Sequence, residues 1–173
     1  LRGATLPKTA HGRIGFIQTR AGEAEAERLV LPPLVVDADG LKLLAKIPDW
    51  QKLLPAPAVL TPHPGEMSVL TGLTKEEIQK DRLAIASRFA QTWGHVVVLK
   101  GAFTVIASPE GVARISPFAN PGLASAGTGD VLAGAIGGLL AQGLSPVDAA
   151  TCGVYLHGAA AEELRHHLGD AGL

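Results

Sequence analysis

Short apolar runs alternate with stretches of helical periodicity along the middle of the chain. The apolar runs lie at residues 31–36 (LPPLVV), 58–61 (AVLT) and 95–100 (HVVVLK). Runs of this length that end at polar or turn-forming residues are typical of buried strands. Apolar positions repeat at helical spacing within residues 41–47 and 78–90. Strands that alternate with helices predict an α/β fold, with a mostly parallel sheet covered by helices on both faces.

Local start and stop signals support the predicted helices. Residues 74–77 (TKEE) fit a capping box, and Gly94 is placed to end the helix that follows. Gly143 ends a later helix, and Ser145 with Pro146 begins the last one, which we expect to run to about residue 164.

The remaining segments complete a single domain. Residues 103–108 and 112–115 flank a Pro-Glu-Gly turn and predict a β-hairpin, and residues 21–30 predict a short helix. The chain of 173 residues has about the length of one domain, with no internal repeat and no linker to a second domain. We therefore expect one domain over residues 1–173.

Residues 120–142 (NPGLASAGTGDVLAGAIGGLLAQ) are the most distinctive stretch of the chain. Gly127 and Gly129 permit a tight loop, and Asp130 opens an apolar segment with helical spacing. The N-terminus of such a helix has unpaired N–H groups and a partial positive charge, which favour a phosphate group. A carboxylate there repels the anion unless a cation intervenes or the acid acts as a base. The motif suggests chemistry on a hydroxyl beside a phosphate; the alternative is that Asp130 only caps the helix.

Polar residues follow each of the three predicted strands. These residues are Asp37 and Asp39, then His63 and Glu66, then Lys100 and Gly101. The prolines on both sides of His63 hold it in an extended backbone. Ligands of parallel sheets bind beyond the carboxyl ends of the strands. We therefore expect these clusters and the loop at residues 127–130 to surround one phosphate-handling site.

Composition and charge exclude several classes of function. Hydrophobic residues make up 47% of the chain and the formal net charge is −1, so bulk electrostatics indicate neither a nucleic-acid nor a membrane surface. The single cysteine, Cys152, excludes an internal disulfide and favours a cytoplasmic setting. We expect Cys152 to be a small buried side chain of the last helix. Because the first residue is Leu1 rather than Met, we also expect a piece of a longer protein.

Four motifs in order resemble the ADP- or ATP-dependent NAD(P)H-hydrate dehydratases, which have a ribokinase-like fold. The motifs are VVDADGL (residues 35–41), TPHPGE (61–66), VVVLKGAFTVI (96–106) and NPGLASAGTGDVLAG (120–134). The resemblance covers residues 34 to about 168. It implies a lyase that removes water from (6S)-NADHX or (6S)-NADPHX and restores NADH or NADPH, with ADP or ATP as co-substrate.

The resemblance also implies roles for individual residues. Contacts to the hydrate fall on His63 and Asp130, and Asp130 is the base that takes the proton of the C6 hydroxyl. Contacts to the nucleotide fall on Lys100, Gly101, Ala102, Phe103, Thr104 and Gly129, and the Gly127 backbone joins them around the phosphoryl group. Mg²⁺ is expected with the nucleotide, and Glu66, Asp37 and Asp39 are candidate ligands, Glu66 through water. A tetramer is implied as well.

The front of the chain departs from the family pattern. Family members have further strands and helices before the VVDADGL strand, and they have a Gly-rich turn just upstream of it. Residues 11–15 (HGRIG) are the altered counterpart of that turn, which makes Gly15 a candidate substrate contact. We therefore expect a ribokinase-like domain that lacks its N-terminal portion.

Two other functions fit the same features. A ribokinase-type kinase acting on a small alcohol, such as a vitamin precursor, would use the same loop and Asp130 to transfer phosphate. A catalytically silent nucleotide-binding protein would agree with the short front end. The TPHPGE motif, with His63 where kinases of this fold commonly have Asn, favours the dehydratase.

Overall fold

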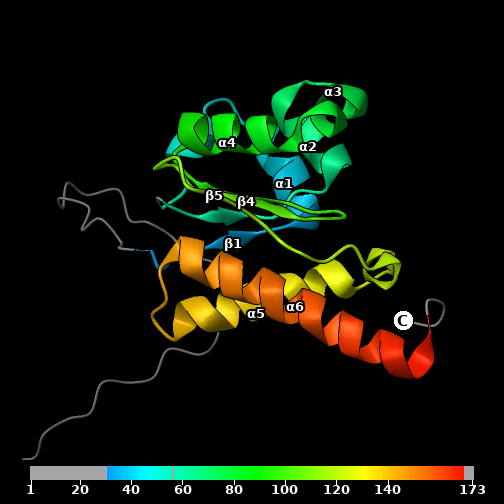
Figure 1. Ribbon diagram of the computed structural model, residues 1–173. Helices are drawn as coiled ribbons and strands as arrows, with labels where there is room; N and C mark the ends of the chain where they lie inside the picture. Colours follow the sequence, from blue (N-terminus) through cyan, green and yellow to red (C-terminus); the bar gives the residue numbers. More distant parts are fainter. Residues whose placement is uncertain (1–30, 56, 170–173) are drawn as a thin grey trace, which may run out of the picture.

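Helices cover both faces of a mixed sheet in the computed structural model, which describes residues 31–55 and 57–169 (Figure 1). The elements in chain order are β1 (Val35–Val36), α1 (Ala38–Leu44), η1 (Trp50–Lys52), β2 (Val59–Leu60), α2 (Pro64–Thr71), α3 (Lys75–Lys80), α4 (Arg82–Trp93), β3 (Val96–Leu99), β4 (Val105–Ala107), β5 (Ala113–Ile115), η2 (Pro121–Ala124), α5 (Thr128–Ala141) and α6 (Pro146–Leu168). The alternation confirms the predicted α/β class. The helix predicted at residues 21–30 and the candidate contact Gly15 lie outside the described residues.

The five strands of the described part lie in sequence order across the sheet. β1, β2 and β3 pair in parallel, and β4 and β5 extend the sheet as the predicted antiparallel hairpin. The carboxyl ends of the three parallel strands therefore share one edge with the amino end of β4, because β4 runs opposite to β3. The residues just beyond the strands at this edge include Asp37, Lys100 and Thr104.

Strand β3 contributes to two hydrophobic cores because its side chains alternate between the faces of the sheet. Val97 and Leu99 pack in a cluster with side chains of α1, α2 and α4, whereas Val96 and Val98 pack with α5 and α6. Figure 1 shows these two groups of helices on opposite sides of the sheet. All four β3 side chains are completely buried, which agrees with the continuous apolar run at this position.

The predicted capping signals occur at the observed helix ends. The Thr74 side chain accepts a hydrogen bond from the Glu77 N–H group at 3.2 Å, and Gly94 ends α4 with a φ of 71°. Ser145 accepts from the Asp148 N–H group at 3.2 Å at the start of α6. No helix within residues 31–55 and 57–169 is both long and apolar enough to cross a membrane.

Several element predictions were wrong in detail. The first strand is confined to Val35–Val36, and the sequence analysis did not identify α2, which begins with a Pro-Gly pair of the kind typical of turns. The helix predicted as continuous after residue 74 breaks at Asp81 (φ −149°, ψ 73°), whose side chain instead caps α4. Cys152, predicted to be buried, is exposed on α6.

Candidate active site

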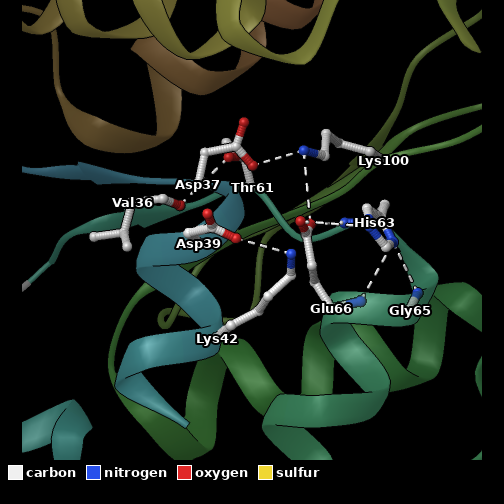
Figure 2. A network of polar contacts seen from close by, with 9 residues as sticks. All are labelled: Val36, Asp37, Asp39, Lys42, Thr61, His63, Gly65, Glu66 and Lys100. Atoms are coloured by element: carbon white, nitrogen blue, oxygen red, sulfur yellow. Dashed lines mark hydrogen bonds and ion pairs between the residues drawn. The ribbon is translucent and has the colours of Figure 1, made fainter. Parts of the chain in front are cut away.

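The polar clusters predicted at the strand ends meet at one edge of the sheet (Figure 2). Lys100, directly after β3, places its Nζ 2.6 Å from Asp37 Oδ1 and 3.7 Å from Glu66 Oε2. Asp37 follows β1, and Glu66 lies in α2, which follows β2. The Lys100 side chain is only 19% exposed and the two acids less than that. Lys100 is therefore not a solvated surface charge.

His63 is oriented by the first turn of α2. Its Nδ1 accepts hydrogen bonds from the Gly65 and Glu66 N–H groups at 2.9 and 3.3 Å, and Glu66 Oε2 accepts from the His63 N–H group at 2.8 Å. Because Nδ1 accepts, the neutral ring carries its proton on Nε2, which lies 3.4 Å from Glu66 Oε1. The predicted extended backbone of His63 is confirmed (φ −79°, ψ 168°). The ring is 53% exposed, so it has a set direction and remains accessible to a ligand.

The three acids predicted as magnesium ligands have different surroundings. Asp37 Oδ2 is buried and has no hydrogen-bond partner among the described residues, whereas both oxygens of Glu66 contact His63 or Lys100. Asp39 is 87% exposed, and the hydrogen bond from Lys42 lowers the pKa of the Asp39 carboxyl. Asp37 is thus the buried acid with an oxygen left over for a cation. Within the described residues, no three His, Cys, Asp or Glu side chains gather into a metal site.

Helix α5 begins at the predicted loop, but Asp130 does not cap it. The N-cap is Gly127 (φ 90°), which lacks a side chain, and Asp130 is the third helical residue. The Asp130 side chain is exposed and makes no hydrogen bond or ion pair with any described residue. The capping alternative is therefore wrong, and the carboxylate is open to a substrate. Thr128 fixes the loop, because its hydroxyl donates to the carbonyl oxygens of Leu123 and Ser125.

Gly129 brings the start of α5 against the Lys100 cluster. A Cβ atom at this position would lie 3.4 Å from Lys100 Nζ and 3.5 Å from Asp37 Oδ2. A side chain would therefore fill the space beside the free Asp37 oxygen. Because Asp130 follows directly, the structure brings the loop, the lysine and the strand-end acids together as predicted.

A cavity of about 410 Å³ opens next to this cluster. Of the predicted nucleotide contacts, those that line the cavity are Lys100, Gly101, Ala102, Thr104 and Gly129. Phe103 and Gly127 are not part of its wall. The wall also includes the apolar side chains of Phe118, Leu132 and Val154. A wall with both polar and apolar residues suits a ligand that joins a phosphate to a ring.

The segment at residues 100–104 has an irregular backbone. Gly101 has a φ of 143° and Phe103 a φ of 54°, a region that non-glycine residues seldom occupy. The Phe103 N–H group donates to Phe118 O at 2.8 Å, and the Thr104 hydroxyl donates to Gly101 O at 2.9 Å. The N–H groups of Gly101 and Ala102 have no partner among the described residues. Both residues line the cavity, so two backbone donors are available to an anion there.

The sequence analysis missed three residues that shape this site. His157 lines the cavity, and its hydrogen bond to the Thr128 backbone offsets only part of the burial that lowers its pKa. Asn120 is buried and joins the Gly122 N–H group to Ala161 O. Arg82 donates to backbone carbonyls at the end of β3. Only His157 had a sequence signal, because it lies three residues after the core residue Val154 on the same side of a helix.

Comparisons with known proteins agree on one family. A family model described as NAD(P)H-hydrate dehydratase matches residues 21–171. The bifunctional NAD(P)H-hydrate repair enzyme Nnr of Moorella thermoacetica is 54% identical over 139 residues, which are 79% of this chain and 26% of that protein.

Solved structures give the same result. The ADP/ATP-dependent NAD(P)H-hydrate dehydratase of Bacillus subtilis, co-crystallized with ATP/Mg²⁺, matches with a TM-score of 0.73 and 40% identity over 82% of this chain and 49% of that one. A ribokinase-like superfamily protein of Enterococcus faecalis matches with a TM-score of 0.65 and 32% identity over 78% of this chain and 45% of that one. The ribokinase-like fold is confirmed. The chain spans about a quarter to a half of the length of these relatives.

Proposed function

The chain belongs to the NAD(P)H-hydrate dehydratase family, and we propose that it carries the nucleotide-dependent site that dehydrates (6S)-NADHX and (6S)-NADPHX to NADH and NADPH. One observation carries the proposal: Gly129, at the start of α5, lies against Lys100 and Asp37, beside a cavity lined by the predicted nucleotide contacts. The exposed Asp130 follows Gly129 directly. A base beside a phosphate site is what phosphoryl transfer to a hydroxyl requires.

The reaction begins at the C6 hydroxyl of the hydrate. Asp130 takes the hydroxyl proton while the oxygen attacks the terminal phosphorus of the nucleotide, and the bond from that phosphorus to the bridging oxygen breaks. The free N–H groups of Gly101 and Ala102 and the first turn of α5 stabilise charge on the phosphoryl oxygens. Lys100 adds a positive charge beside them.

Elimination then restores the nicotinamide ring. The C6–O bond breaks with inorganic phosphate as the leaving group, C5 loses a proton, and the lone pair of the ring nitrogen supplies electron density. Phosphate leaves more readily than hydroxide, so the protein mainly supplies position and electrostatics. His63 is placed to orient the hydrate, since its ring is half exposed and its direction is set by Gly65 and Glu66.

The residues present fit a magnesium ion that accompanies the nucleotide. Asp37 Oδ2 is buried without a partner, and the absence of a side chain at Gly129 leaves space beside it. Mg²⁺ prefers carboxylate, phosphate and water oxygens and keeps few protein ligands, so one carboxylate is enough here. When bound, the ion would neutralise charge on the nucleotide phosphates. Glu66 would act through water, as predicted, while it orients His63.

The test is recovery of NADH from NADHX in the presence of ADP or ATP and Mg²⁺, followed by absorbance. We expect wild-type protein to recover NADH and the Asp130→Asn variant to lose at least about a hundredfold in kcat, the usual contribution of a general base. Nucleotide affinity should stay near the wild-type value, because Asp130 acts on the hydroxyl of the hydrate and not on the nucleotide. Nucleotide binding without turnover in the wild type would indicate the silent protein. A phosphorylated alcohol without NADH would indicate the kinase.

The setting of the protein follows from the same proposal. We place it in the cytoplasm, where the nicotinamide cofactors are used and where a lone exposed thiol such as Cys152 stays reduced.

We also propose a homo-oligomer, because α5 and α6 expose the large apolar residues Val131, Tyr155 and Leu156. Light scattering coupled to gel filtration tests this: a monomeric mass at micromolar concentration would contradict it.

A further inference from the structure

Arg82 begins α4 and reaches the end of the neighbouring strand. Its guanidinium donates to Leu99 O at 2.8 Å and also to Ala102 O. Leu99 is the last residue of β3, and Ala102 lies in the segment at residues 100–104 that lines the cavity. One side chain thus binds two carbonyl oxygens on either side of Lys100 and Gly101.

This placement is unfavourable for the arginine itself. A cation in the first turn of a helix faces the positive end of the helix dipole. Burial lowers the pKa of Arg82, and its Nε is buried without a partner among the described residues. Arg82 is partly buried, and no carboxylate of the described residues forms an ion pair with it, although buried charges are normally paired. A cation at this position destabilises the helix start, so the presence of Arg82 is explained best by its hydrogen bonds to Leu99 O and Ala102 O.

The held segment needs support because its backbone is strained. Phe103 has a φ of 54°, and Gly101 has a φ of 143° that other residues rarely adopt. Arg82 draws Leu99 O and Ala102 O toward α4. The next N–H groups then donate elsewhere, Lys100 to Pro62 O and Phe103 to Phe118 O, both bonds being 2.9 Å or shorter. The N–H groups of Gly101 and Ala102 remain as free donors at the cavity wall.

We propose that Arg82 is a positioning residue that holds residues 100–104 in the conformation that binds the nucleotide. The proposal rests on the proposed function for the identity of the ligand, but not for the hold on the segment. Gly101 fits the same picture, because a Cβ there would lie 3.0 Å from an Arg82 Nη atom and displace it.

The test compares Arg82→Met, which keeps the aliphatic stem, with Arg88→Met as the matched control. Arg88 lies on the same helix, is exposed, and stacks on Phe89 with its Cζ 4.5 Å from the ring centre. In nucleotide-free protein we expect faster amide exchange at Lys100 and Phe103 in Arg82→Met only. In calorimetry with MgATP we expect affinity to fall on the order of tenfold, as for lost hydrogen bonds to a charged group.

Turnover separates positioning from general damage to the fold. The KM for nucleotide should rise in Arg82→Met and kcat should fall, since the Gly101 and Ala102 N–H groups also stabilise charge on the phosphoryl oxygens, while the KM for the hydrate stays near the wild-type value. A variant that is merely destabilised would lower the active fraction and leave both KM values unchanged. Exchange and affinity equal to those of Arg88→Met would overturn the proposal.

Two further outcomes remain decisive. Should Arg82→Met fail to fold, Arg82→Lys replaces it, because a lysine forms one of the two bonds and should give an intermediate exchange rate and affinity. Wild-type exchange and affinity in Arg82→Lys would then overturn the proposal. Should the wild type bind no nucleotide, the proposed function fails, whereas the exchange comparison still decides the role of Arg82.

Discussion

Lys100 is the cation that keeps two carboxylates together at the sheet edge. Its Nζ contacts Asp37 at 2.6 Å and lies 3.7 Å from Glu66, and all three side chains are largely buried. Partly buried charges of like sign repel strongly when the opposite charge between them is removed. Lys100 therefore has two effects that a substitution must separate: it holds the two acids together, and in the proposed function it attracts phosphate.

A pair of variants separates these effects. Lys100→Met should lower both the free energy of unfolding and the affinity for nucleotide, the latter by about 1–3 kcal/mol for a lost charge-assisted hydrogen bond. The double variant Asp37→Asn with Lys100→Met removes one of the two repelling carboxylates, so stability should recover in part while nucleotide affinity does not. Urea unfolding and calorimetry measure the two quantities. If Lys100→Met unfolds at the wild-type urea concentration, the ion pair contributes nothing to stability.

His95 links the stability of the fold to pH. The ring is completely buried, its Nδ1 accepts from the Ala58 N–H group at 3.1 Å, and its Nε2 lies 2.9 Å from Gln51 O. Burial lowers the pKa of His95 below its usual value, more than the Gln51 contact raises it. The unfolded chain therefore takes up a proton before the folded protein as the pH falls. The free energy of unfolding should be greatest above the unfolded pKa of about 6.5 and decrease below it.

Urea unfolding at several pH values checks this prediction. The pH should extend about 1.5 units to each side of the unfolded histidine pKa of about 6.5. His95→Gln should reduce the decrease in stability at low pH, at the cost of lower stability throughout. His166→Gln is the control, since His166 is exposed near the end of α6 and should leave the pH dependence as it is. If the free energy of unfolding depends on pH in the same way in His95→Gln and in the wild type, groups other than His95 cause the decrease at low pH.

At the scale of elements, α5 and α6 pack closely through glycine. A Cβ at Gly153 would lie 2.6 Å from Ile136 Cγ1, closer than any real contact, and 3.5 Å from the Ile136 backbone. Gly153→Ala should therefore lower the free energy of unfolding by about 1–3 kcal/mol, the usual cost of overpacking. Gly138→Ala on α5 is the control, because nothing lies within 4 Å of its Cβ position. It should stabilise α5 by about 0.5–1 kcal/mol. Thermal unfolding that ranks the two variants the other way would contradict the packing.

The element scale also shows what the sequence could predict. Thr74, Gly94 and Ser145 mark helix ends through bonds within a few residues, so their role follows from local sequence. The break at Asp81 and the start of α2 also have local causes, because Asp81 caps α4 and His63 caps α2. These caps compete with other local patterns, which are the apolar spacing around Asp81 and the Pro-Gly pair after His63. Where two local signals disagree, the packing of the whole chain decides which secondary structure forms. The sequence alone does not reveal that packing.

At the scale of the whole molecule, the site draws on both layers of helices. Its acids and Lys100 come from the edge where the parallel strands end, which polar residues after apolar runs made predictable. Arg82 and Asn120 were not predictable, because their partners are backbone carbonyl oxygens 17 to 41 residues away in the chain. Backbone acceptors are present at every residue, so no residue type marks such a contact in advance.

The proposed nucleotide would contact elements from both layers, so its binding should stabilise the molecule as a unit. A nucleotide at a concentration about 100 times its Kd adds about 2.7 kcal/mol to the free energy of unfolding if only the folded chain binds it. Amide exchange should slow both at residues 100–104 and at the start of α5, because both segments contribute to the wall of the same cavity. Asp130→Asn should keep this protection, and Lys100→Met should lose most of it. Protection confined to one of the two segments would mean that the nucleotide does not bridge the lysine and the α5 loop, and the phosphoryl-transfer geometry would then be wrong.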